Sequence, residues 1–344
     1  MAAGAAPRDA ITNHLFASQE LFRSWGIESE IYATHIEPTL KDDVRPADLF
    51  PKEVRASVPV VVHYSIDSPG FRLAVQHSDA PLFHYHNITP AQLLWRYAPH
   101  IAVECAAGRR RLGEYADVVV GSAADSAYNA GELREAGFAD PRSVGILRNS
   151  VGSTDTSHRA PGDGPLKLLF VGRGVPNKAQ HDLIYALAAL LEASQDVELW
   201  LVGAWNTAPL YRRQCGRLAT DLGVDDRVMF IDRATQNELR RRYADADLFL
   251  CLSDHEGFCV PLLEAMEAGL PIVAYDSSAI PETLGDAGLI LPDKTPSLVA
   301  EAVMAVALDR GLQEQFASAR QERLAYFAPD AVAGRIRDFL TPYL

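Results

Sequence analysis

The chain of 344 residues has only four cysteines, no apolar run long enough to cross a membrane and no surplus of basic residues. The cysteines stand far apart and without metal-type spacing, so we expect reduced thiols and a cytoplasmic location. The net charge of −13 argues against binding to nucleic acid or to an anionic membrane. Met1 to Pro7 lacks a basic region followed by an apolar core, so we expect no signal peptide.

The composition is that of a globular protein, with 48% hydrophobic and 22% charged residues, and the length predicts two domains. Apolar strands alternate with helical segments, which predicts parallel sheets covered on both faces. The elements expected in the first half are strands over 27–33, 58–63, 81–86 and 118–121, and helices over 9–25, 89–97 and 102–115. Those expected in the second half are strands over 166–171, 197–202, 228–231, 247–252, 271–275 and 289–291, and helices over 179–193, 207–222, 236–244, 261–268 and 329–341.

One segment, 153–165, has no apolar period and is the best linker in the chain. We therefore expect an N-terminal domain over 1–152 and a C-terminal domain over 166–328, followed by a last helix within 329–344. A domain in which parallel strands alternate with helices normally begins with a strand, but only Met1 to Arg8 precede the first expected helix. Because this segment cannot supply an apolar strand of the usual five or six residues, we expect the first strand to be missing or very short.

The most informative stretch follows the apolar run 247–252, which predicts a buried strand. Pro261 then opens a helix, where its missing N–H costs nothing, and Gly269 ends that helix. A loop between a strand and a helix N-terminus is the geometry that binds a phosphate. The groups expected to face the anion are Gly257 and the amides of Phe258, Cys259 and Val260.

The same stretch contains E-G-F-x-x-P-L-L-E-A-M-x-x-G-x-P-I-V, which resembles the E-x7-E signature of retaining glycosyltransferases of family 4. The two glutamates are Glu256 and Glu264. The resemblance is strong over 166–292 and weaker over 9–150. It implies the GT-B fold, an α/β architecture of two Rossmann-like doubly wound parallel-sheet domains that face each other across a cleft. In such proteins the last helix usually crosses back to the N-terminal domain.

A second motif, Gly172-Arg173 followed at a distance by Lys178, resembles the G-R-x-x-x-x-K clamp of this family. The resemblance implies that both cations neutralise the leaving diphosphate, because GT-B enzymes use fixed cations where GT-A enzymes use a metal. Asp245-Ala246-Asp247 spells the D-x-D of a metal site. It stands where a helix passes into a buried strand, so we expect it to orient backbone, and we expect no metal.

Histidines end two apolar strands of the N-terminal half, His63 and His86, and His84 shares a face with His86 at period two. His86 and Asn87 resemble the family's strand–histidine loop, whose imidazole touches the donor sugar. A histidine at a strand end is also a common structural residue, and that alternative stays open for His63. The resemblance assigns catalysis to Arg173, Lys178, Glu256 and His86, and the acceptor side to Asp9, Asn13, His63 and Asn87.

The same resemblance assigns residues to the base and to the ribose of the nucleotide-sugar donor. Glu264 would hold the ribose hydroxyls, His255 would contact donor hydroxyls, and Arg233 would lie beside the base in a turn where a glycine is often seen. Cys259 replaces a common glycine of the phosphate loop, so its side chain would narrow the donor pocket.

The resemblance implies a retaining, metal-independent glycosyltransferase that moves a hexosyl-type sugar from a nucleoside-diphosphate sugar, UDP before GDP, to a hydroxyl acceptor. The partners are then the nucleotide sugar and a small-molecule or glycan acceptor, without a separate cofactor, and a homodimer is left open. The alternatives are a GT-B sugar phosphorylase or synthase, and a pseudoenzyme that only binds nucleotide sugars.

Overall fold

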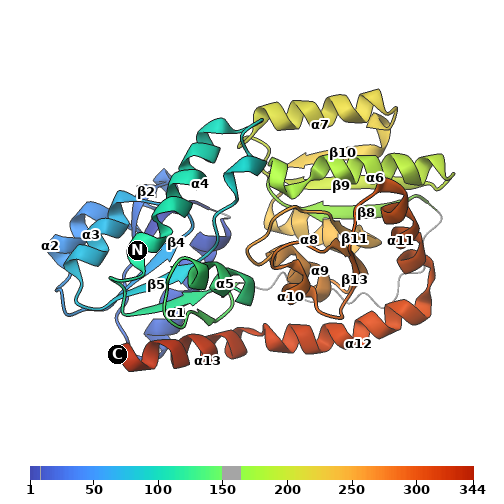
Figure 1. Cartoon of the computed structure of the whole chain (residues 1–344). Coiled ribbons are helices and arrows are strands. Elements are labelled where there is room, and N and C mark those ends of the chain that lie inside the picture. The colour runs from blue at the N-terminus through green and yellow to red at the C-terminus, as the bar shows by residue number, and fades with distance from the viewer. Residues whose placement is uncertain (8, 149–163) are drawn as a thin grey trace. The chain divides into compact units, whose positions relative to one another are not determined.

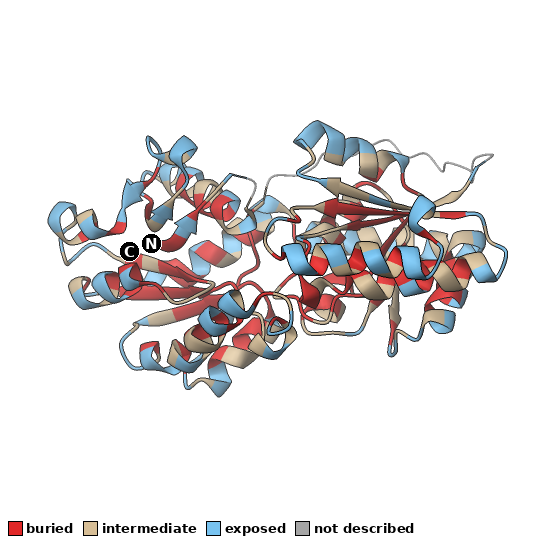
Figure 2. Cartoon of the chain, turned by 90° about the horizontal axis from the view of Figure 1, so that it is seen from above, coloured by how far each residue is buried: buried red, intermediate tan, exposed pale blue. Residues whose placement is uncertain are grey.

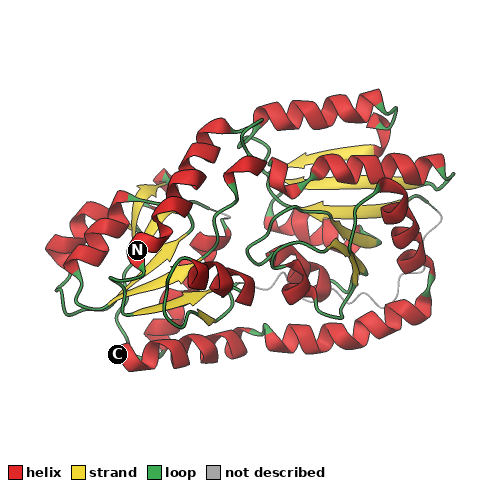
Figure 3. Ribbon diagram, viewed as in Figure 1, coloured by secondary structure: helices red, strands yellow, loops and turns green. Residues whose placement is uncertain are grey.

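The computed structural model describes residues 1–7, 9–148 and 164–344. The chain divides into two compact units. The first comprises Met1–Thr89, Val103–Asn149 and Tyr326–Leu344, and the second comprises Pro90–Ala102 and Ser150–Ala325. The expected linker over 153–165 lies outside the described residues except for its last two positions. Figures 1 and 3 show that each unit is a sheet flanked by helices.

The first unit contains a parallel sheet of seven strands in the order β3-β2-β1-β4-β5-β6-β7. Its strands are β1 (Ala2–Ala5), β2 (Tyr32–Ile36), β3 (Arg45–Pro46), β4 (Val60–Tyr64), β5 (Pro81–Tyr85), β6 (Gly121–Ala124) and β7 (Arg142–Ser143). Its helices are α1 (Ala10–Ser24), α2 (Phe50–Glu53), α3 (Pro69–His77), α5 (Ala127–Glu135), α13 (Pro329–Leu340) and most of α4 (Pro99–Arg111).

Of the two alternatives expected for the first strand, missing or very short, the first is wrong, because β1 is a central strand of this sheet, and the second agrees with its four residues. It pairs in parallel with β2 on one side and with β4 on the other. The N–H of His63 also donates to the carbonyl of Met1 at 2.8 Å. Helix α3 packs closely at the start of this strand, since a Cβ added to Gly70 of α3 would lie 3.3 Å from the Met1 sulfur. The strand is four residues long, and its place is secured by the backbone ladder and not by bulky side chains.

Three further expectations for the N-terminal half of the sequence differ from the structure. The strand expected over 27–33 begins at Tyr32, where β1 and β3 offer partners on both sides. The helix expected over 89–97 is a 3₁₀ turn of three residues, Ala91–Leu93, in a segment that Pro90 and Pro99 bound. The strand expected over 118–121 is β6, which uses small residues, while Val118 and Val120 are exposed.

The second unit contains a parallel sheet of six strands in the order β10-β9-β8-β11-β12-β13. The expected strands are all present: β8 (Leu166–Val171), β9 (Val197–Gly203), β10 (Val228–Asp232), β11 (Leu248–Cys251), β12 (Ile272–Tyr275) and β13 (Leu289–Leu291). The helices are α6 (Gln180–Glu192), α7 (Pro209–Asp221), α8 (Gln236–Asp245), α9 (Val260–Glu267), α10 (Ile280–Leu284), α11 (Pro296–Leu308) and α12 (Arg310–Tyr326), the last of which ends in the first unit.

Burial follows the sheets, as Figure 2 shows, with buried residues concentrated on the strands and on the helix faces turned toward them. In the second unit β11 is buried along its whole length because helices cover both faces of a parallel sheet. In the first unit α13 packs Ile336 and Phe339 against Leu82 and Ala123 of the sheet, alongside α1. No helix in the described parts of the chain is long and apolar enough to span a bilayer.

Candidate active site

The phosphate-type loop of the second unit connects the end of β11 to the start of α9. The helix begins at Val260, one residue before the expected proline, and Gly269 follows its end with φ 76°. The loop is anchored from two sides. The N–H of Glu256 donates to Ser278 Oγ at 2.7 Å, and Thr283 Oγ1 donates to the carbonyl of Phe258 at 2.5 Å. These bonds hold the loop backbone in one shape before any ligand binds.

Cys259 precedes α9 with φ 71° and ψ 65°, in the left-handed region. This conformation strains a residue with a side chain and suits glycine. The replacement noted from the sequence therefore lies at a position where glycine is the unstrained choice. The Cys259 side chain is buried, and its thiol lies within 4.8 Å of the Cys251 thiol and of a Glu256 carboxylate oxygen.

The two predicted motifs of this unit meet through an ion pair. Lys178 Nζ lies 2.5 Å from Glu256 Oε2, and the lysine side chain is 16% exposed. Asn177 reinforces the contact, because its Nδ2 donates to the carbonyl of His255 at 3.2 Å and its own carbonyl accepts from the N–H of Asp254 at 2.9 Å. The loop after β8 and the loop after β11 thus form one polar centre, which we call the Lys178–Glu256 centre.

Arg173 and Gly172 lie beside this centre at the end of β8. Arg173 is exposed, and its carbonyl accepts a hydrogen bond from Gln180 Nε2 at 2.8 Å. The backbone is crowded here, because a Cβ added to Gly203 would lie 1.9 Å from the Gly172 carbonyl oxygen. The crowding and the hydrogen bond from Gln180 fix the backbone path at Gly172 and Arg173.

The residues predicted for ribose and base are also in the second unit. Glu264 lies in α9, and its Oε2 accepts a hydrogen bond of 2.7 Å from the hydroxyl of Tyr243. Arg233 follows β10 with φ 50°, which explains why a glycine suits this turn, and it is exposed. Asp247 orients backbone as expected, since its Oδ2 accepts from the N–H of Lys167 at 2.8 Å.

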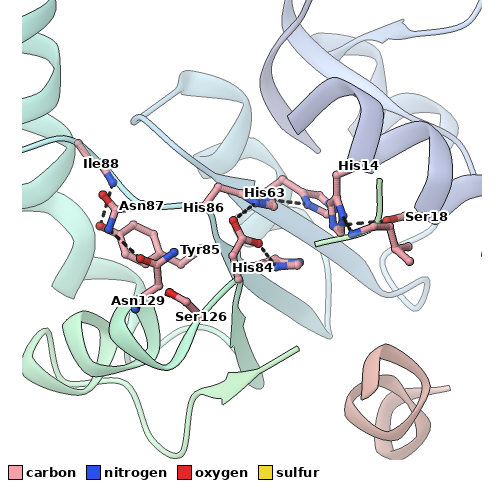
Figure 4. A network of polar contacts seen from close by, with 12 residues as sticks. His14, Ser18, His63, His84, Tyr85, His86, Asn87, Ile88, Ser126 and Asn129 are labelled. Carbon is pink, nitrogen blue, oxygen red and sulfur yellow. Dashed lines mark hydrogen bonds and ion pairs between the residues drawn. The ribbon is translucent and has the colours of Figure 1, made fainter. Parts of the chain in front are cut away.

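The first unit holds a second polar centre, the histidine cluster of His14, His63, His84 and His86 (Figure 4), together with Asp125, which contacts two of the rings. His63 and His84 are directly opposite each other in β4 and β5. Asp125 lies 2.9 Å from His84 Nε2 and 2.9 Å from His86 Nδ1, and His86 Nε2 lies 3.0 Å from His63 Nδ1. His14 was missed from the sequence, although α1 places it on the same buried face as Leu15 and Ser18.

Burial controls the protonation of this cluster. It lowers the pKa of His14 and of His63 well below the ordinary value, and it also lowers the pKa of His84. Burial alone would raise the pKa of Asp125, but the charge of His86 and the hydrogen bonds from His84 and His86 outweigh it and lower that pKa. The cluster is therefore a buried carboxylate that bonds His84 and His86, with the rings of His14 and His63 close to them.

Of the remaining predicted residues of the first unit, Asp9 and Asn87 have side-chain partners within that unit. Asp9 caps α1, and its Oδ2 accepts from the N–H of Thr12 at 3.0 Å. Asn87 adopts φ 72° and donates from Nδ2 to Asn129 Oδ1 at 2.8 Å and to Glu132 Oε2 at 2.9 Å. Asn13 is exposed on α1. Their assignment to the acceptor side stays a prediction.

The architecture defines the class: two units, each a parallel sheet with helices on its faces, are the GT-B fold. Anabaena HepE, solved in complex with UDP and glucose, matches with a TM-score of 0.76 at 15% identity, over 99% of each chain. The glycosyltransferase WaaG, involved in lipopolysaccharide biosynthesis, matches with a TM-score of 0.71 at 16% identity, over 99% of this chain and 100% of WaaG. At these identities the likeness shows the fold alone.

Sequence comparisons supply the family. Residues 154–323 match the model of the glycosyl transferases group 1, which places the second unit of the chain in that family. A GDP-mannose-dependent alpha-(1-6)-phosphatidylinositol monomannoside mannosyltransferase of Mycobacterium tuberculosis is 31% identical over 50% of this chain and 46% of its own. A D-inositol 3-phosphate glycosyltransferase of Streptomyces bingchenggensis is 27% identical over 67% of this chain and 54% of its own. The chain thus spans about half the length of these curated relatives.

Proposed function

We propose that the chain is a retaining glycosyltransferase that moves a hexosyl-type sugar from a nucleoside-diphosphate sugar to a hydroxyl acceptor without a catalytic metal. The observation that carries the proposal is the Lys178–Glu256 centre, which joins the two motifs of the group 1 family in one place. Such a centre has a fixed ammonium and an anchored loop next to a helix N-terminus. Both are suited to a diphosphate on which negative charge develops.

In this proposal Lys178 and Arg173 act on the leaving group. As the bond between the sugar carbon and the β-phosphate oxygen breaks, charge moves onto the diphosphate, and cations held beforehand stabilise that state more than the bound substrate. Glu256 holds the ammonium of Lys178 in position, and its second oxygen is the one we assign to a sugar hydroxyl. Glu264, oriented by Tyr243, is assigned to the ribose hydroxyls.

Retention of configuration is proposed by analogy with the family and not from a nucleophile in the site. In that mechanism the acceptor oxygen attacks the face from which the diphosphate departs, and the departing phosphate oxygen takes the acceptor proton. The predicted contact of His86 with the donor sugar requires one of its ring nitrogens to exchange its present partner, Asp125 or His63.

The nucleotide base is the least constrained part of the proposal. UDP remains our first expectation, while the mannosyltransferase relative is GDP-mannose-dependent by name, so GDP-mannose is the first alternative. Thermal shift with UDP-, GDP- and ADP-sugars tests this, because a ligand that binds only the folded chain raises its melting temperature. Release of nucleoside diphosphate from the stabilising donor then tests turnover.

Three outcomes separate the alternatives. Transfer to an acceptor, or slow donor hydrolysis, supports a transferase. Release of sugar phosphate that depends on added inorganic phosphate identifies a phosphorylase. Binding without any turnover leaves a pseudoenzyme, an alternative that loses one of its arguments because the first strand is present. The proposal fails altogether if no nucleotide sugar raises the melting temperature.

A further inference from the structure

The histidine cluster brings four imidazoles together inside the first unit. His14 comes from α1, His63 from β4, His84 from β5 and His86 from the residue after β5. Their exposed fractions are 1%, 6%, 5% and 9%, so all four rings are withdrawn from solvent. One nitrogen of each ring lies within 4.8 Å of a nitrogen of every other ring. Figure 4 shows the rings turned toward one another.

The position of Asp125 decides which nitrogens remain available. The Asp125 carboxylate accepts hydrogen bonds from His84 Nε2 and His86 Nδ1, each at 2.9 Å. Both of these nitrogens therefore carry a hydrogen. In the neutral rings the lone pairs are therefore on His84 Nδ1 and His86 Nε2. A carboxylate that accepts from the distal N–H of a histidine, leaving the other nitrogen to a cation, is the usual outer shell of a protein metal site.

His63 supplies a third nitrogen in the right place. Its Nδ1 lies 3.0 Å from His86 Nε2, so one hydrogen now lies between the two. If that hydrogen sits on His63 Nε2 instead, both facing nitrogens offer lone pairs and no proton leaves the site. His14 is the weakest of the four, because its Nδ1 accepts from the N–H of Leu147 at 2.9 Å and its hydrogen therefore belongs on Nε2.

We propose that this cluster is a binding site for a zinc-type divalent cation, with His63, His84 and His86 as its three protein ligands and His14 beside them, held by Leu147 and Ser18. Zinc–nitrogen bonds of about 2.0–2.1 Å place the ligands of a tetrahedral ion roughly 3.4 Å apart. The His63–His86 pair, at 3.0 Å, is already near that spacing. Neutral imidazoles are the form that zinc binds, and Asp125 offsets one of the two added charges.

A metal-free polar network is the competing explanation, because three hydrogen bonds already join the rings and Asp125. Zinc binding by the chain, measured as described below, separates the two explanations. The site is confined to the first unit, whereas the transfer proposed above uses cations of the second unit. The zinc proposal can therefore be wrong while the transfer proposal is right, and the reverse. Zinc at His86 Nε2 would exclude a direct contact between this ring and a donor sugar, so the site also assigns His86 a structural role.

The test is zinc binding by the chain itself, without reference to turnover. The full chain, stripped with a chelator, is titrated with zinc against a chromophoric competitor, and its melting temperature is measured with and without the ion. We expect one equivalent to bind and to raise the melting temperature. His84→Gln should lower the affinity at least 100-fold. Asp125→Asn, which keeps both ligands, should lower it about 10–100-fold.

Two controls keep the result interpretable. His35→Asn removes an exposed histidine outside the cluster and should leave zinc affinity unchanged. Cys251 and Cys259 form, with Glu256, the other group of close metal-type ligands among the described residues. With cobalt in place of zinc, a spectrum that lacks thiolate-to-metal charge transfer assigns the ion to the histidines.

The proposal is overturned if the stripped chain binds no zinc, or if His84→Gln binds as tightly as the parent. Charge transfer that disappears in Cys259→Ser would likewise move the ion to the second unit and overturn it. If His84→Gln does not fold, the cobalt spectrum of the parent chain decides between the two groups alone.

Discussion

The two polar centres of the molecule differ in how their charges are balanced. In the first unit Asp125 is 4% exposed and its partners are rings of the same buried cluster. In the second unit Lys178 and Glu256 also pair, but Arg173 beside them is exposed and the loop backbone is held by its neighbours. A closed centre of the first kind suits a structural role or a small cation, whereas a centre with an exposed cation suits an anionic ligand.

The sharpest way to break this comparison is Lys178→Ala. Removing a preorganised cation from a leaving group typically lowers turnover on the order of 10²–10³-fold. The substitution also leaves Glu256 buried without its ion-pair partner, so we expect a loss of about 1–3 kcal/mol in the free energy of unfolding. Steady-state rates and urea unfolding measure the two effects.

Lys294→Ala is the matched control for Lys178→Ala. Lys294 Nζ is 2.5 Å from Asp254 and 2.5 Å from Asp182, and its side chain is 21% exposed, so the lost ion pairs are comparable. The control should lose stability and keep turnover. Equal turnover losses in the two variants would mean that the Lys178 effect is structural.

Arg173 tests the exposed side of the second centre. Arg173→Ala should lower turnover on the order of 10²-fold with little change in stability, because the guanidinium is exposed and its anchor is the backbone. Arg173→Lys should restore part of the rate, since a point charge does not reproduce a bidentate fork. Full activity of Arg173→Ala would exclude the clamp.

Substitutions at Glu264 test the proposed contact between the second unit and the ribose of the nucleotide. Glu264→Gln should weaken nucleotide binding about tenfold, the equivalent of about 1.4 kcal/mol, with a smaller effect on the catalytic step. Tyr243→Phe keeps the carboxylate and removes the hydrogen bond that orients it, so its effect should be smaller. Calorimetry with the nucleoside diphosphate measures both; an equal loss in the two variants would point to helix packing instead of the ribose.

Cys259 gives a smaller effect, on stability alone. Cys259→Gly removes the strain of φ 71° but also removes a buried thiol, so we expect a change within about 1 kcal/mol. Cys259→Ala keeps the strain and loses the thiol, and should be the less stable of the two. Thermal unfolding of both variants isolates the cost of the left-handed conformation, and a more stable alanine variant would contradict it.

The smallest expected effect is that of a chelator on transfer. We expect the rate measured well below the melting temperature to be unchanged, because Arg173 and Lys178 supply the positive charge. A chelator that lowers only the melting temperature would point to the histidine cluster. Activity that is abolished and then restored by manganese, at unchanged stability, would contradict metal-independent transfer.

The second unit was predictable because its strands are continuous runs of large apolar residues, such as Leu248–Cys251, in a sheet buried on both faces. The strands of the first unit were harder to predict from the sequence. Ala2–Ala5 and Gly121–Ala124 are strands of small residues, whose hydrophobic signal is weak although each strand pairs with a neighbour on both sides. The error at the first strand came from expecting large side chains where neighbouring helices leave room for small ones.

The amino-acid sequence by itself determined the alternation of strands and helices, the class of fold and the two motifs of the second unit, because these depend on local periodicity and on short spacings. Only the tertiary structure decided which side chains share a centre. It paired Lys178 with Glu256 across 78 positions of sequence, and it added His14 and Asp125 to the strand-end histidines. Such contacts depend on strand order and register, which parallel sheets set through crossovers that no local pattern encodes.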